Sequence, residues 1–172
     1  MHRTAALALG TLGLAAVTAF PALANAKDPK AFLDQAIRGD VAKVQLGQLA
    51  EANGASIGVK NFGQTLDSDH SIAAAEATQV ASAHGITPPG DLTPAAQQEL
   101  DKLAKLSGPA FDREFTRAMI AEQRSDIRAF EAEAKANQGD VSALAAKQLP
   151  TLRAHLQTAE NLQRESRMHS AK

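Results

Sequence analysis

The chain has 172 residues, of which 18 are lysine or arginine and 19 are aspartate or glutamate, giving a formal net charge of −1 at pH 7. This near balance of charge, together with the absence of tryptophan and tyrosine, argues against binding to a nucleic-acid backbone and against an interfacial membrane anchor. The sequence contains no cysteine, which excludes disulfides, thiol catalysis and a lipid-modified cysteine.

The first 26 residues have the layout of an export signal. A basic residue precedes an apolar run over residues 5–20, and small residues form an A-x-A cleavage site that ends at Ala26. The apolar run is too short for a comfortable transmembrane span, and no second one follows it. We therefore expect residues 1–26 to be removed and residues 27–172 to be periplasmic without a transmembrane span, association with the outer membrane being left open.

The rest of the chain reads as all helical, because good helix formers dominate it and residues that favour strands are few. The first helix is expected from about Asp28, the N-cap residue before Pro29, to Asn53. Gly54 then ends that helix and Ser56 caps a second one, which extends to about residue 84. These two helices should form the first hairpin of the fold.

A crossover of about 25 residues follows and carries a short helix from Pro94 to about Leu106. A third long helix is expected from about Pro109 to residues 137–139, and a fourth from Asp140 to about residue 167. Two helical hairpins joined by one long connection make a four-helix bundle of ferritin-like topology, an up-and-down bundle being the alternative. The sequence thus predicts one all-α domain with a short extra helix in the crossover.

Each long helix has an apolar stripe at a spacing of 100° per residue, with a polar residue at or beside the middle of the stripe. On the first helix the expected stripe consists of Leu33, Ile37, Val41 and Val44. The four polar residues are Asp40, His70, Gln123 and His155. Antiparallel packing would bring them to one level of the bundle. Because buried polar groups cost a few kcal/mol without partners, we expect this mid-bundle polar layer to bind its own members, water or an ion.

Three interpretations of the layer remain open. In the first, His70 and His155 are neutral core residues that hydrogen-bond Gln123 and Asp40 and fix the register of the helices. In the second, both imidazoles and the carboxylate of Asp40 hold one divalent metal ion such as Zn²⁺ or Fe²⁺, for metal storage or oxidoreductase chemistry. In the third, the core takes an apolar or amphipathic ligand, or the four residues do not meet.

The sequence shows no catalytic constellation. A di-iron site of the ferritin type needs Glu-x-x-His pairs on two helices, and no Glu-x-x-His occurs in the chain. Nucleophile, phosphate-loop and dinucleotide motifs are also absent. Of the acids near His70, Asp67 could orient its ring from three residues before it, whereas helical geometry turns Asp69 about 100° away. We predict no catalytic residues, no bound cofactor, and an unidentified protein or small molecule as partner.

Three segments carry a resemblance to a known family. They are "VKNFGQTLDSDHSIAAAE", "SGPAFDREFTRAMIAEQRSDIRAFEAEAK" and "LPTLRAHLQTAENL". In this combination they resemble domain of unknown function 4142, a family of exported bacterial proteins often labelled putative outer membrane proteins, and the resemblance extends from about Asp28 to Gln163. It implies a ferritin-like four-helix bundle and carries no established activity.

Two departures from that family bear on the metal interpretation. Lys43 in "KVQLGQLA" stands where family members commonly have an acid, and Gln123 in "AEQRSD" stands where they commonly have a histidine. A cation and an amide in these places should weaken a metal site, so the resemblance favours a non-enzymatic structural or interaction role in the cell envelope. By analogy with the family, we also expect a link to stress tolerance.

Overall fold

The computed structural model describes residues 28–170, and within this range the chain is built of helices and loops. The helices are α1 (Pro29–Asn53), α2 (Ile57–Ala83), α3 (Pro94–Leu103), α4 (Gly108–Ala134) and α5 (Asp140–Ser170). The expected export signal lies outside the described residues. The all-helical prediction is confirmed.

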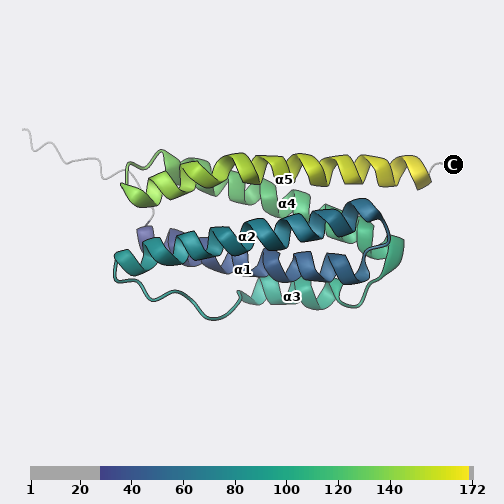
Figure 1. Cartoon of the computed structure of the whole chain (residues 1–172), viewed down its shortest axis with the longest axis horizontal. Coiled ribbons are helices and arrows are strands. Elements are labelled where there is room, and N and C mark those ends of the chain that lie inside the picture. Colours follow the sequence, from purple (N-terminus) through teal and green to yellow (C-terminus); the bar gives the residue numbers. More distant parts are fainter. Residues whose placement is uncertain (1–27, 171–172) are drawn as a thin grey trace, which may run out of the picture.

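The long helices pair as two hairpins, α1 with α2 and α4 with α5, and these lie against each other along their length (Figure 1). The crossover over residues 84–107 returns along the bundle and carries α3, which packs on α1 and α4 (Figure 1). The two hairpins with one long connection are those of a ferritin-like four-helix bundle. No helix in the described part of the chain is both long and apolar enough to cross a membrane.

Local signals in the sequence set most helix boundaries. The side chains of Asp28, Ser56 and Thr93 accept hydrogen bonds from the first turns of α1, α2 and α3, as N-cap residues do. Two helices end earlier than expected, α3 at Leu103 and α4 at Ala134. After α4 the chain turns through Asn137 and Gly139, both with positive φ, so the reversal occupies the residues where the sequence predicts the end of the helix.

Two glycines let α1 and α2 approach closely. A Cβ atom on Gly47 would lie 2.5 Å from the carbonyl oxygen of Gly63, and a Cβ atom on Gly63 would lie 2.5 Å from that of Gly47. No side chain could occupy either position without moving the backbones apart. This contact lies about two turns from Asp40 on α1 and about two turns from His70 on α2, the polar residues expected at mid-bundle.

The buried face of α1 differs from the expected stripe. Leu33 and Ile37 are buried as predicted, but Val41 is exposed and Lys43 is buried. The buried face is broader than the expected stripe, because α1 contacts α2, α3 and α4 and most of its circumference is covered. The prediction that Val41 belongs to the core was wrong.

Candidate functional site

The apolar core is divided into two clusters by polar residues at the middle of the bundle. On α2, His70 lies between Leu66 of one cluster and Ala77 of the other. On α5, His155 lies between Leu152 and Ala159, which again belong to different clusters. We use the name polar layer for the group Asp40, Lys43, Asp69, His70, Gln123, Asp126 and His155.

Asp40 and His70 form a buried pair between α1 and α2. Oδ1 of Asp40 lies 2.8 Å from Nδ1 of His70, and the two residues are 4% and 2% exposed. When Asp40 is ionised, the His70 ring donates its Nδ1 proton to it, which leaves Nε2 with only a lone pair. A carboxylate on the neighbouring helix thus explains how a histidine is accommodated in the apolar stripe of α2.

His155 is bonded to Asp69, a residue that helical spacing was expected to turn away from His70. Nε2 of His155 lies 2.8 Å from Oδ2 of Asp69, so the bond joins α5 to α2 and therefore the two hairpins. The rings of His155 and His70 lie next to each other, with centroids 5.2 Å apart. The second acid considered, Asp67, instead contacts the side chain of Gln48.

Lys43 carries its positive charge into the same level of the bundle. Its side chain is 4% exposed, and Nζ lies 2.6 Å from Oδ2 of Asp126 on α4. A buried ammonium without a counter-charge would be strongly unfavourable, so this ion pair is what permits the lysine to be inside. It also forms a second link between the hairpins, from α1 to α4.

Several buried polar atoms of the layer have no hydrogen-bond partner. They are Oδ2 of Asp40, Nε2 of His70, Nδ1 of His155, and both amide atoms of Gln123. Gln123 is fully buried on α4, yet the expected hydrogen bond from Gln123 to a histidine is not made, and that part of the first interpretation was wrong. Such atoms are costly unless water or a ligand reaches them.

Burial and neighbouring charges shift the pKa values of the layer. Burial raises the pKa of Asp40 to about 7, although the charge of Lys43 opposes this. Burial lowers the pKa of His70 to about 2, and the charge of Lys43 acts in the same direction. The pKa of His155 is lowered by burial, against its hydrogen bond to Asp69. The Asp40–His70 pair therefore carries a charge of −1 above about pH 7 and no net charge below it.

Lys43 is charged across the physiological range. Burial works against its positive charge, but the carboxylates of Asp126 and Glu122 outweigh burial and raise the pKa of Lys43 above its usual value. Burial also raises the pKa of Glu122 itself. A fixed cation thus lies beside the Asp40–His70 pair.

The residues of the layer do not fit a bound metal ion. In the described part of the chain, no group of three or more histidine, cysteine, aspartate or glutamate side chains is arranged to hold one. One nitrogen of each imidazole is engaged by a carboxylate, which leaves neither ring free to offer that nitrogen to a metal ion. The metal interpretation therefore lacks a ligand set.

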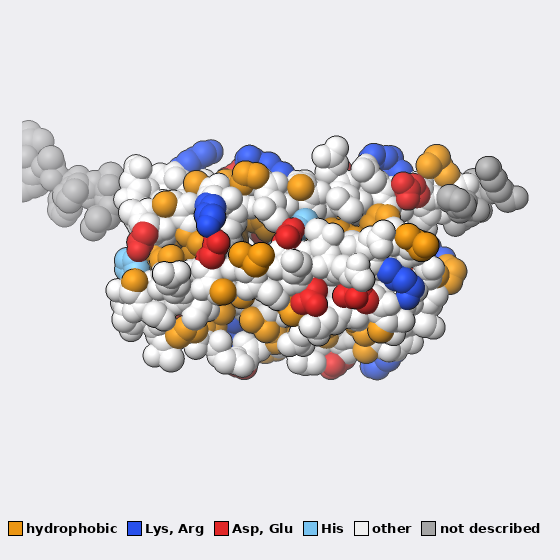
Figure 2. Space-filling view, in the orientation of Figure 1, with side chains coloured by type: hydrophobic (Ala, Val, Ile, Leu, Met, Phe, Trp, Pro, Cys, Tyr) orange, Lys and Arg blue, Asp and Glu red, His pale blue; other side chains and the backbone are white. Residues whose placement is uncertain are grey.

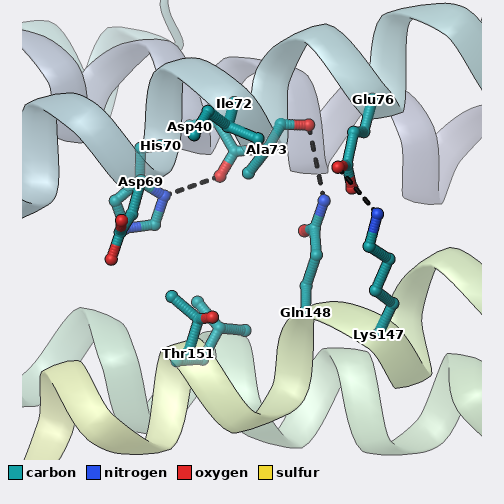
Figure 3. Close-up of a pocket in the computed structure, with 10 residues that line it drawn as sticks. Asp40, Asp69, His70, Ile72, Ala73, Glu76, Lys147, Gln148 and Thr151 are labelled. Atoms are coloured by element: carbon teal, nitrogen blue, oxygen red, sulfur yellow. Dashed lines mark hydrogen bonds and ion pairs between the residues drawn. The ribbon is translucent and has the colours of Figure 1, made fainter.

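A cavity of about 230 Å³ opens between α2 and α5 and reaches the polar layer. Asp40, Asp69 and His70 line one end of it, and the His70 ring extends from α2 toward α5 (Figure 3). At the other end of the cavity, Glu76 on α2 forms an ion pair with Lys147 on α5 (Figure 3). The layer is therefore reached from the surface on this side.

Helical spacing placed four residues at this level, and the structure adds Lys43, Asp69 and Asp126 to them. The sequence held one signal for the first of these, because Lys43 lies one turn after Asp40. No local signal marked Asp69 or Asp126, since their partners lie 86 and 83 residues away in the chain.

Residues 14–162 match the family described as a domain of unknown function, DUF4142. The chain belongs to this family. The match confirms the resemblance read from the sequence segments around His70, Gln123 and His155. No curated protein and no solved structure shows a significant match to the chain.

Proposed function

We propose that this DUF4142 protein is exported to the cell envelope and has a structural or interaction role there, without enzymatic activity. The observation that carries this proposal is the direction of the bonds in the polar layer. His70 is bonded to α1, His155 to α2, and Lys43 to α4, so each partnered side chain reaches a different helix. Such bonds fix the register of the helices rather than prepare a group for chemistry.

These bonds matter because the two hairpins contact each other much less than the two helices within each hairpin do. The interface between α2 and α5 is bridged by the Asp69–His155 bond, by the Glu76–Lys147 ion pair, and by a bond from Gln148 to the carbonyl of Ala73. Polar bridges of this kind act only at one register, whereas an Ala-rich apolar face tolerates sliding. The layer thus supports a rigid scaffold that presents constant surfaces to a partner.

Export is tested by the mass of the accumulated protein. Expressed in its own cell type and recovered from a periplasmic extract, the protein should begin at Lys27, because Ala26 ends the A-x-A site. As control, the Ala24→Leu/Ala26→Leu variant should accumulate with its first 26 residues attached. Recovery of the wild-type chain uncleaved in the cytoplasm would contradict the proposal.

The envelope role is tested by deletion of the gene. We expect impaired growth under acid, oxidant or osmotic challenge and normal growth without it, with recovery when the wild-type chain is supplied. A deletion strain that grows as well as wild type under all three challenges would remove the link to stress tolerance.

Elemental analysis separates this proposal from a metal-dependent function. Protein purified without a chelator should contain no stoichiometric transition metal, because each imidazole is already held by a carboxylate and no ligand group for a metal ion is arranged in the described residues. One equivalent of iron, zinc, copper or manganese that persists through gel filtration would overturn the non-enzymatic proposal.

A further inference from the structure

The cavity between α2 and α5 is lined by two residues whose buried hydrogen-bond acceptors no donor of the protein satisfies. Oδ2 of Asp40 and Nε2 of His70 are both buried and without a hydrogen-bond partner, and both residues line this cavity. With Asp40 ionised, both atoms can only accept, because the His70 proton is on Nδ1 and points at Asp40. Both acceptors therefore lack a donor from the protein.

The charges around the cavity have the sign that attracts a cation. Among the residues that line it, Asp40, Asp69 and Glu76 are acids, and Lys147 is the single base, already paired with Glu76. Figure 2 shows acidic and hydrophobic side chains together on this face of the molecule. The Lys43 ammonium acts on Asp40 and His70 but does not line the cavity, and its charge is balanced by Asp126 within the layer.

The remaining walls combine three apolar side chains with the polar side chains of Gln148 and Thr151, and the volume is small. Ile72, Ala73 and Leu152 line the cavity beside the acids, and Ile72 is exposed at its edge. At about 230 Å³ the space is below the roughly 300 Å³ at which pockets for drug-sized ligands begin. An occupant must therefore be short, with one donor-rich cationic end and a few carbon atoms.

We propose that this cavity binds a small primary alkylammonium ion, with its ammonium group at Asp40 and His70 and its hydrocarbon chain against Ala73 and Leu152. An ammonium group carries three N–H donors and one positive charge, which supplies what both unpartnered acceptors lack. A neutral alcohol of the same shape offers one donor and no charge. A carboxylate offers no donor and is repelled by the acids.

This inference deepens the proposed interaction role by naming a ligand class, and it depends on that role only in being non-catalytic. Export can fail its own test while the cavity still binds an amine, because binding is measured on purified protein. Conversely, a cavity that binds no amine leaves the export test unaffected. The two failures are therefore distinguishable.

The test is a calorimetric titration of the purified protein at pH 8 with n-butylammonium chloride, with 1-butanol and sodium butyrate as matched probes. We expect one saturable site for n-butylammonium, and at least about tenfold weaker binding of 1-butanol, since a charge-assisted hydrogen bond contributes on the order of tenfold or more in affinity. Butyrate should not bind. In parallel, the imidazole resonances of His70 should shift on addition of n-butylammonium.

Two variants test separately the charge of the site and the space in the cavity. Asp40→Asn keeps an acceptor for the Nδ1 proton of His70 but removes the charge, and should weaken n-butylammonium at least about tenfold. Ala73→Leu leaves the acids in place and fills the cavity, and should also abolish binding. Asp34→Asn is the control, because Asp34 is an acid of α1 that pairs with Lys30 and does not line the cavity.

Each outcome of these titrations either supports the site or overturns it. Loss of binding in both cavity variants with wild-type affinity in Asp34→Asn supports the site. Equal affinity for n-butylammonium and 1-butanol, binding that survives Asp40→Asn or Ala73→Leu, or no saturable binding by the folded wild-type protein would each overturn the inference. Stoichiometric binding of Zn²⁺ that displaces the amine would overturn it as well, in favour of a metal site.

Discussion

The carboxylate of Asp69 bonds to the ring of His155, 2.8 Å from Nε2, although its neighbour in the sequence is the other histidine of the layer. Adjacent residues on α2 thus serve different partners, with His70 directed to α1 and Asp69 to α5. The consequence is that one short stretch of chain ties together three helices. Asp69 is partly exposed, but its bond to His155 gives it a structural role.

Removal of this carboxylate should destabilise the fold. In Asp69→Ala the buried His155 ring loses the acceptor for its Nε2 proton, so we expect the free energy of unfolding in urea to fall by about 1–3 kcal/mol. Asp67→Ala is the matched control on the same helix, with an expected change within about 0.5 kcal/mol. Similar losses in both variants would show that the Asp69–His155 bond contributes nothing particular.

The Lys43–Asp126 ion pair should behave as a buried pair and not as a surface one. Lys43→Met leaves Asp126 without its cation and should lower the free energy of unfolding by about 3 kcal/mol. The double variant Lys43→Met/Asp126→Leu removes both charges and should recover most of that loss. A Lys43→Met variant as stable as wild type in urea unfolding would show that the ammonium is solvated in solution.

Replacement of Asp40 should stabilise the protein at pH 8. Burial raises the pKa of Asp40 to about 7, so keeping it ionised at pH 8 costs folding free energy. Asp40→Asn removes that cost while keeping an acceptor for His70, and we expect a gain on the order of 1–2 kcal/mol in urea unfolding at pH 8. A costly charge retained at a cavity is typical of a binding site, because function and stability then oppose each other. A less stable Asp40→Asn variant would contradict this argument.

The pH dependence of stability should reveal how Asp40 and the histidines are coupled. The folded-state pKa of His155 is lowered, so the unfolded chain takes up a proton near pH 6.5 that the folded one does not, and stability present above that pH is lost as pH falls. For His70 the same loss is offset, because the folded pair takes up a proton on Asp40 near pH 7. Between about pH 4 and 6.5 the Asp40–His70 pair therefore adds little to the pH dependence of the free energy of unfolding.

Asp40→Asn removes this offset and should make the acid dependence steeper. Between pH 6.5 and 5 its stability should fall by about 1.4 kcal/mol per pH unit more than that of wild type, which corresponds to one additional proton. Urea unfolding at several pH values measures the two slopes, with Asp34→Asn as control. Parallel slopes for wild type and Asp40→Asn would mean that His70 and Asp40 do not titrate as a pair.

Local chemistry in the sequence predicts most of the fold. Asp28, Ser56 and Thr93 mark helix starts because their side chains can satisfy free backbone N–H groups, and that signal needs no tertiary information. Helical spacing likewise places His70 and His155 inside, where both rings are found. The close contact at Gly47 and Gly63 was missed, because a glycine in a helix gives no indication of which backbone approaches it.

The composition of the polar layer was harder to predict for a physical reason. A charged residue is normally assigned to solvent, and only a partner distant in the chain reverses that expectation. Lys43 is inside because Asp126 is opposite, and Asp69 belongs to the layer because α5 brings His155 to it. Gln123 shows the converse, since its spacing correctly indicates burial but says nothing about a partner.

The most direct test of the polar layer is the tautomeric state of its two histidines, read from the ring ¹⁵N chemical shifts of the labelled protein at pH 8. The account predicts opposite tautomers, with the proton of His70 on Nδ1, facing Asp40, and that of His155 on Nε2, facing Asp69. Asp40→Asn and Asp69→Asn should each affect chiefly the ring they contact. If both rings instead carry the proton on the same nitrogen and exchange it rapidly with water, the histidines are solvated and the buried layer does not exist.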